Sequence, residues 1–372
     1  MDTTIKIPWA KPDIGKEEFD EIKNSFENNW FTLGPKVKLF EKQMANYCNA
    51  PYSAAVSNGT VALDIALKTI GISPGDEIIV PAMTYFSTAS SVSYQNAVPV
   101  FVDIDKESYN LDPGKIVQSI TNKTKAIMFI DYGGNASDQS NIFEIAKKYN
   151  LTVVQDGAQS LGGTYHGKPM GANAEISTMS FHLAKNLTCI EGGMVFTHNK
   201  NFFKQIMMRR NQGEVNNRKY EHLTLGTNAR MTDLQAGIGL AQFKKLPKFL
   251  KERKRVAKIY DELFKESKLD IKVPKTKHSD TTNAYFFYPI LLNGRNNIAQ
   301  ALRSKYGIDT RIAYSMPVYD QHLYKSGQAK CRHTACPVAE EVTKKILNLP
   351  IFPSMNEKSI KTVVNAIKSE IK

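Results

Sequence analysis

Polar residues with catalytic potential stand where short apolar, strand-like runs end. Asp156 closes LTVVQD (151–156), while Ser180 and Lys185 lie at and just beyond the end of ISTMSF (176–181). In open α/β sheets, ligands bind beyond the carboxyl ends of the strands, so these side chains can converge on one crevice. A buried lysine that loses its charge is a nucleophile toward carbonyl carbon. Lys185 near a carboxylate therefore indicates covalent chemistry on a carbonyl compound.

Two further stretches supply what a phosphorylated aldehyde needs. SNGT (57–60) opens a helix expected over 57–71, and its small residues suit a phosphate because free N–H groups point at it. Tyr85 follows the strand-like run EIIVPA (77–82) and offers a ring for stacking. A phosphate cup, a carboxylate, an aromatic ring and a lysine together fit pyridoxal 5'-phosphate (PLP). Taken singly, each also has an ordinary interpretation as a cap, a turn residue or a solvated loop lysine.

The elements that must position these residues alternate along the first two thirds of the chain. Expected strands cover 77–82, 98–104, 125–132, 151–156, 176–181 and 192–197, and expected helices cover 15–28, 36–48, 57–71, 85–96 and 138–149. Helices between strands require crossover connections, so we expect an α/β fold with a mostly parallel sheet. The strand-like runs are apolar at consecutive positions, which is typical of strands buried on both faces.

The pattern changes after about residue 245. The segments that follow are a long charged helix (246–268), a strand-like run (284–292), a helix (296–306), an extended run (309–317) and a C-terminal helix (357–370). We expect an N-terminal arm and a large cofactor-binding domain over 1–245, and a small α+β domain over 246–372.

Composition narrows the range of partners. The 372 residues carry 49 Lys and Arg against 36 Asp and Glu, a net charge of +13. The densest basic stretch, 244–258, has helical spacing and one aromatic residue, which argues against a nucleic-acid surface and favours attraction of a phosphorylated metabolite.

The sequence shows little sign of a membrane span, a signal peptide or a metal site. No run approaches the ~18 apolar residues of a membrane span, and the first residues lack a signal-peptide core, so we expect a cytoplasmic protein without a membrane partner. CRHTAC (331–336) offers three residues of zinc-ligand type without a second pair, so we expect no metal site.

Nine segments, in order along the chain, carry a resemblance to a known family. They are WFTLGPKVKLFE (30–41), SNGTVALDIAL (57–67), GDEIIVPAMTYFSTA (75–89), PVFVDIDKESYNLDP (99–113), QDGAQSLGGTYHGKPMG (155–171), SFHLAKNLTCIEGGMVFT (180–197), RNQG (210–213), LGTNARMTDLQAGIGLAQ (225–242) and LNLPIFPSM (347–355). Through them the sequence resembles the DegT/DnrJ/EryC1/StrS family of PLP-dependent sugar aminotransferases. The resemblance implies the fold-type I architecture of aspartate aminotransferase, with a sheet of the seven-stranded type flanked by helices.

The resemblance also implies roles for individual residues. Lys185 would bond covalently to the cofactor aldehyde and later carry a proton between substrate and cofactor. Asp156 would keep the pyridine nitrogen protonated, Gln159 would hydrogen-bond the ring oxygen, and Tyr85 would stack on the ring. The phosphate would be held by Gly59, Thr60 and Ser180 and, from the neighbouring subunit, by Asn228. The sites of a homodimer would then be composite.

For the reaction, the resemblance implies amino transfer from an amino acid, with L-glutamate expected, to a nucleotide-linked keto sugar, with a 4-keto-6-deoxy sugar expected. A 3-keto sugar or a keto-cyclitol is the alternative substrate, and a non-catalytic PLP-binding regulatory protein is the alternative outside enzymes. Two departures leave the sugar open, because Asp131 stands where many members have His and Phe287 lies near another such position. Secondary candidates are His182, Glu191, Arg230 and Tyr314.

Overall fold

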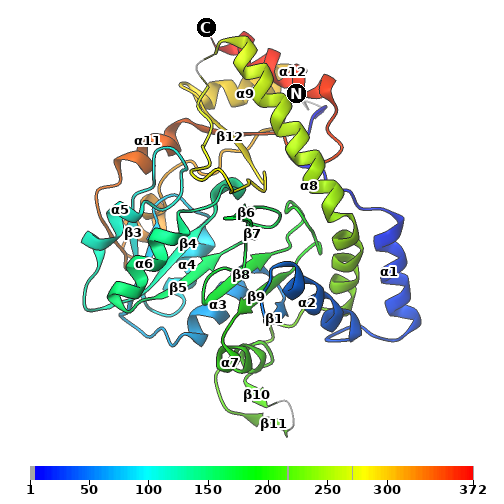
Figure 1. Cartoon of the computed structure of the whole chain (residues 1–372), viewed down its shortest axis with the longest axis vertical. Coiled ribbons are helices and arrows are strands. Elements are labelled where there is room, and N and C mark those ends of the chain that lie inside the picture. The colour runs from blue at the N-terminus through cyan, green and yellow to red at the C-terminus, as the bar shows by residue number, and fades with distance from the viewer. Residues whose placement is uncertain (1–4, 216–217, 270, 372) are drawn as a thin grey trace.

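The computed structural model describes residues 5–215, 218–269 and 271–371, and its centre is one sheet flanked by helices (Figure 1). Within these ranges the sheet has eight strands in the order β1-β9-β8-β5-β4-β2-β3-β13. They are β1 (Tyr52–Val56), β2 (Glu77–Pro81), β3 (Val98–Val102), β4 (Thr124–Ile130), β5 (Thr152–Asp156), β8 (Ile176–Ser180), β9 (Gly193–Thr197) and β13 (Arg332–His333). Only the β8–β9 and β9–β1 pairs are antiparallel, so the expected mostly parallel α/β sheet is confirmed.

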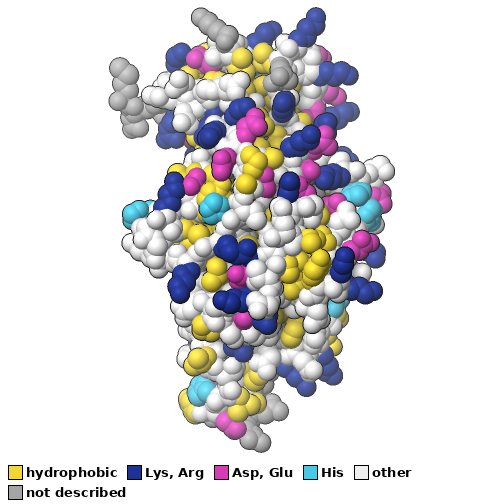
Figure 2. All heavy atoms as spheres, turned by 90° about the vertical axis from the view of Figure 1, so that its left-hand side faces the viewer, with side chains coloured by type: hydrophobic (Ala, Val, Ile, Leu, Met, Phe, Trp, Pro, Cys, Tyr) yellow, Lys and Arg dark blue, Asp and Glu magenta, His cyan; other side chains and the backbone are white. Residues whose placement is uncertain are grey.

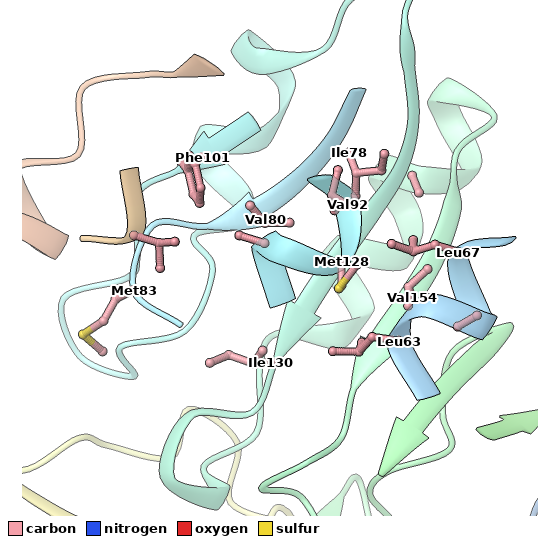
Figure 3. Packing of buried hydrophobic residues seen from close by; sticks show 14 of the residues in the cluster. Leu63, Leu67, Ile78, Val80, Met83, Val92, Phe101, Met128, Ile130 and Val154 are labelled. Atoms are coloured by element: carbon pink, nitrogen blue, oxygen red, sulfur yellow. The ribbon is translucent and has the colours of Figure 1, made fainter. Parts of the chain in front are cut away.

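Helices cover both faces of this sheet. One face packs Leu63 and Leu67 of α3 (Gly59–Thr69) and Val92 of α4 (Phe86–Ser93) against the strands (Figure 3). The opposite face packs residues of α5 (Pro113–Ile116) and α6 (Gln139–Tyr149) against β3 and β4. Neighbouring residues such as Ile78 and Ile79 therefore enter different cores, which explains the unbroken apolar runs in the sequence.

The remaining elements surround this layer. They are α1 (Lys16–Glu27), α2 (Pro35–Tyr47), α7 (Lys200–Arg210), α8 (Asp233–Ser267), α9 (Arg295–Tyr306), α10 (His322–Lys325), α11 (Pro337–Lys345), α12 (Glu357–Glu370), the short pairs β6 (Thr164–Tyr165) with β7 (Lys168–Pro169), β10 (Glu214–Val215) with β11 (Arg218–His222), and β12 (Tyr288–Leu291) with β14 (Ile346–Leu349). Short 3-10 turns cover Val117–Ser119, Tyr132–Gly134 and Val318–Asp320.

A second core lies above the sheet in Figure 1, between α8, α9, α12 and the β12–β14 pair. Along α8, Leu240 and Leu246 pack in the core beside the sheet, whereas Val256 and Tyr260 pack in the second core. The division of the chain at residue 245 stays a prediction, because α8 runs through that point without a break and β13, beyond it in sequence, lies at the edge of the main sheet.

Several predicted boundaries needed correction. The helix expected over 246–268 joins the one that TDLQAGIGLAQ indicates, and the single helix α8 begins at Asp233 because Thr232 caps it with a capping box that also uses Gln235. The run 284–292 forms a strand only over Tyr288–Leu291, and the run 309–317 makes one isolated bridge, at Arg311. The edge strand β1 was not predicted, since YSAAV contains few large apolar residues.

The described residues contain neither a membrane-spanning helix nor a cluster of metal ligands. No helix in this part of the chain combines the length and apolarity needed to cross a bilayer. No group of three or more His, Cys, Asp or Glu side chains there is placed to hold a metal ion.

Gly193 ties the sheet to the start of α3. A Cβ atom at this position would lie 2.4 Å from the carbonyl carbon and oxygen of Asn58 and 2.9 Å from the nitrogen of Gly59. These are backbone atoms, which cannot move aside as the end of a flexible side chain can. Close approach of β9 therefore fixes where α3 begins.

Gly193→Ala should lower the free energy of unfolding by about 1–3 kcal/mol, because the new methyl group must displace backbone. Thermal or urea unfolding of the two proteins checks this. Gly15→Ala is the matched control, since its Cβ would meet nothing closer than a side-chain oxygen of Glu17 at 3.6 Å. Equal losses in both variants would contradict the assigned packing.

Candidate active site

The N-terminus of α3 forms a small cup with the end of β8. Asn58 caps the helix, its side-chain oxygen accepting from the Val61 N–H at 2.9 Å. A Cβ atom on Gly59 would lie 2.8 Å from the Cβ of Ser180, so glycine is needed for this close approach of α3 to the end of β8. The Thr60 hydroxyl lies 2.7 Å from that of Ser87 on α4. Hydroxyl groups and first-turn N–H groups thus converge where an anion is favoured.

Asp156 lies beside this cup at the end of β5 and is 5% exposed. Its carboxylate accepts from the Thr88 hydroxyl at 2.8 Å and from the Ala158 N–H at 3.2 Å, and Thr84 in turn contacts Thr88 at 2.7 Å. Burial raises the pKa of Asp156, while the two donors and the charge of Lys185 act in the opposite direction. A carboxylate in this setting gains from a cationic partner such as a protonated ring nitrogen.

Lys185 lies in the loop after β8, where its N–H donates to the carbonyl of His182 at 2.9 Å. Its ammonium nitrogen stands 4.3 Å from the ring centre of Phe286. Burial lowers the pKa of Lys185 to about 8, and the negative charge of Asp156 opposes the shift. A sizeable fraction of this amine is therefore neutral, and hence nucleophilic, close to neutral pH.

Gln159 and two tyrosines complete the site. The Gln159 side-chain oxygen accepts from the Gly133 N–H at 2.7 Å, which turns its NH₂ group toward the Tyr314 hydroxyl, 3.2 Å away. The Tyr85 ring is 60% exposed, and its centre lies 6.2 Å from that of Tyr314. The sequence could not place Tyr314, whereas the structure brings it from the C-terminal part of the chain to Gln159.

This arrangement fits PLP. Gly59, Thr60 and Ser180 meet at the N-terminus of α3, Asp156 offers a buried carboxylate, and Tyr85 offers an exposed ring. Lys185 supplies an amine with a lowered pKa. These are the groups that a phosphorylated pyridine aldehyde needs for binding and covalent attachment.

Comparison with known proteins is in line with this chemistry. The sequence pattern of the DegT/DnrJ/EryC1/StrS aminotransferase family matches residues 12–368. The chain belongs to this family. It is 34% identical over 376 residues to the GDP-perosamine synthase of Escherichia coli O157:H7, covering 97% of each chain. It is 33% identical to the dTDP-3-amino-3,6-dideoxy-alpha-D-galactopyranose transaminase of Aneurinibacillus thermoaerophilus, covering 95% of this chain and 94% of that one.

A solved structure extends the likeness to the fold. S. venezuelae DesV, in complex with a ketimine intermediate, superposes with a TM-score of 0.89 at 31% identity and covers 95% of this chain and 94% of its own. Membership of the DegT/DnrJ/EryC1/StrS family confirms the predicted aminotransferase and the fold-type I architecture.

The two departures from the family pattern lie in the core. Asp131 is fully buried and accepts from the side-chain NH₂ of Gln155 at 2.8 Å and from the Ser160 hydroxyl at 2.6 Å. Phe287 is also buried, with its ring centre 5.8 Å from that of Tyr132. Neither side chain is exposed, so neither is placed to contact a bound sugar directly.

The secondary candidates take different places. Arg230 donates to the Asn211 side chain at 2.7 Å and so anchors the segment that carries Asn228. Asn228 is exposed, and its neighbour Ala229 accepts from the Ser57 N–H of the same chain at 2.9 Å. His182 lies 3.8 Å from Glu191, and both side chains are more than half exposed. The role of Asn228 toward a partner subunit stays a prediction.

Sequence reasoning missed three residues of the site. Ser87 and Thr88 lie in the first turn of α4, within a motif from which only Tyr85 had been selected. The polar run after Tyr85 was the available signal, because a helix that starts beside a ligand tends to place polar side chains there. Phe286 carried no such signal, since it lies in a run of aromatic residues that reads as core.

Thr88→Val should weaken PLP binding about tenfold, because loss of a hydrogen bond to a charged group leaves Asp156 less able to stay ionised. Equilibrium dialysis of the cofactor-free protein measures the change. The matched control is Thr343→Val, a buried helical threonine whose hydroxyl donates to the Ala339 carbonyl at 2.7 Å, outside the site. Unchanged affinity in Thr88→Val would refute the support given to Asp156.

Proposed function

We propose that this protein is a PLP-dependent aminotransferase that moves an amino group from L-glutamate to a nucleotide-linked keto sugar, at the 4-position of a 4-keto-6-deoxy sugar. The observation that carries the proposal is the pairing of Lys185, whose pKa is lowered to about 8, with the buried carboxylate of Asp156 beside the cup at Gly59.

Each residue of the site has a task in this reaction. When bound, PLP supplies an electron sink for the carbanion that forms next to the transferred nitrogen. Lys185 would hold the cofactor aldehyde, and its free amine would accept and return the proton at the substrate carbon. Asp156 keeps a proton on the ring nitrogen, and Gln159 donates to the ring oxygen. Tyr85 covers one face of the ring.

The substrate class rests on charge and on the relatives. Two relatives are named for GDP- and dTDP-linked sugars, and a net charge of +13 favours a diphosphate. On the face in Figure 2, Lys and Arg side chains are spread among acidic and apolar ones, as suits a general attraction better than a nucleic-acid track. The relative named for a 3-amino sugar keeps a 3-keto sugar as the second candidate.

The test is a panel of nucleotide-linked 4-keto and 3-keto sugars and a keto-cyclitol, each incubated with PLP and glutamate. We expect amination of a 4-keto sugar, read by product mass and by NMR of the amino-bearing carbon, with release of 2-oxoglutarate. Borohydride reduction of the loaded protein should attach the cofactor to Lys185. Lys185→Ala should abolish turnover while the protein still folds.

Amination of a cyclitol alone would refute the substrate class, and near-normal turnover by Lys185→Ala would refute the role of the lysine. If the protein binds PLP but aminates none of these compounds with any amino donor, the result would favour a non-catalytic, PLP-binding regulatory protein.

We also propose that the active sites are composite and that the protein works as a homodimer. Asn228 is exposed, and the nearby Tyr220 and Leu225 are 87% and 86% exposed, which is unusual for large apolar side chains unless a partner covers them. A two-fold symmetric dimer would present the same segment of each subunit to the other. Asn228 could then reach the phosphate held by the partner subunit.

Mixing two inactive variants tests this. Lys185→Ala subunits exchanged with Asn228→Asp subunits should regain about a quarter of wild-type activity, because half of the dimers are mixed and each has one intact site. Every other site lacks the lysine, meets an Asp carboxylate that should repel the phosphate, or carries both lesions. Exchange is verified by native mass spectrometry, and exchange without recovery would contradict shared sites.

A further inference from the structure

The ring of Phe286 lies against the ammonium nitrogen of Lys185, 4.3 Å from ring centre to nitrogen. This is within the range of a cation–π contact, in which the ring face attracts the charge while its carbon atoms exclude water. We propose that Phe286 sets the reactivity of Lys185 before a carbonyl compound arrives, and that buried Arg253 positions Phe286. The inference deepens the proposed function and rests on it.

The backbone next to Phe286 has a strained conformation and is held in place by hydrogen bonds. Tyr285 has a φ of +49°, a left-handed conformation that non-glycine residues adopt rarely. The Asn283 side chain accepts from the Tyr285 N–H at 2.6 Å, so the turn is stabilised locally. The Tyr285 carbonyl accepts from the Arg253 guanidinium at 3.0 Å, and the Phe286 carbonyl lies 3.5 Å from the same nitrogen. Strain at this point directs the next side chain, Phe286, toward Lys185.

Contacts from the large domain fix the same segment from the other side. Asn186, the residue after Lys185, donates to the Ala284 carbonyl at 3.0 Å. The Ala284 N–H donates to the Gly134 carbonyl at 2.9 Å, and the Phe287 N–H donates to Gly133 at 3.1 Å. The ring is thus tied to the loop that bears the lysine and cannot withdraw unless these bonds break.

Arg253 is an unusual anchor. It is 5% exposed, and its hydrogen bonds go to backbone carbonyls, with that of Ile351 at 3.2 Å. Burial lowers the pKa of Arg253 to about 10. Lys185 and Arg253 line one cavity of about 20 Å³, together with Lys11 and Pro12 of the N-terminal arm. Burying a guanidinium costs free energy when no carboxylate pairs with it. Its burial here is best explained by the backbone segment that its hydrogen bonds hold in place.

The ring has two opposite effects on Lys185, and two substitutions separate them. Phe286→Leu keeps an apolar side chain but removes the π face, so the ammonium form loses its attraction. Phe286→Ala opens the space to water, so the ammonium form is solvated. The two variants should therefore shift the titration of Lys185 in opposite directions.

The measurement uses the cofactor-free protein and a small acylating reagent, acetic anhydride. Only the neutral amine reacts, so the rate of Lys185 acylation against pH, followed by peptide mass spectrometry, gives the titration midpoint. Phe286→Leu should lower the midpoint by about half to one and a half pH units. Phe286→Ala should raise it, and Arg253→Lys should raise it less, since a loosened segment admits water.

Phe264→Leu is the matched control, a buried aromatic of the second core for which the midpoint should stay at the wild-type value. Thermal unfolding of each variant verifies the fold, and if the alanine variant does not fold, the leucine variant still decides. A wild-type midpoint in both Phe286 variants, or a shift of both in the same direction, would overturn the inference. The midpoint is measured without substrate, so failure of the amination panel would count against the proposed function alone.

Discussion

Burial of an amine and a carboxylate in one crevice is the constraint on which the rest of this structure depends. Loss of water lowers the pKa of Lys185 and raises that of Asp156, so burial pushes both groups toward their neutral forms. Their mutual attraction acts against this. The reaction needs an amine that is partly neutral and a carboxylate that stays charged. Hydrogen bonds from the Thr88 hydroxyl and the Ala158 N–H to Asp156 favour the charged carboxylate without acting on the amine.

The parallel strands of the sheet bring these groups to the same place. Because β4, β5 and β8 are parallel neighbours, the turn at Gly133, the carboxylate of Asp156 and the hydroxyl of Ser180 all stand at one edge. The antiparallel return of β9 then brings Gly193 behind the start of α3, which fixes the cup at Gly59. One reversal of strand direction therefore builds the anion-binding end of the site.

Residues at strand ends and helix starts could be predicted from the sequence, because their position follows from local pattern and from the geometry of parallel sheets. Asp156, Lys185 and Gly59 are of this kind. Phe286 and Tyr314 are not, since they come from the C-terminal part of the chain and join the core beside the sheet only through long-range packing, which no local signal encodes. The sequence also indicates a helix over TDLQAGIGLAQ, but not that it continues into the charged helix, because Pro247 lies between the two and is usually a helix breaker.

Near the site, the two cores are joined by hydrogen bonds to backbone groups. This arrangement bears on which substrates the site can distinguish. The buried Tyr132 hydroxyl donates to the Ala313 carbonyl, which Asn348 also contacts at 3.2 Å, so the peptide before Tyr314 is held from both cores. Buried differences from the family pattern, such as Asp131, act on this shared framework rather than on a sugar directly. Discrimination between keto sugars must then come from side chains that remain exposed at the rim. Tyr85 fits that description, and the half-buried Tyr314 faces it from the C-terminal part of the chain, so the ketone would lie between surfaces that belong to different parts of the chain.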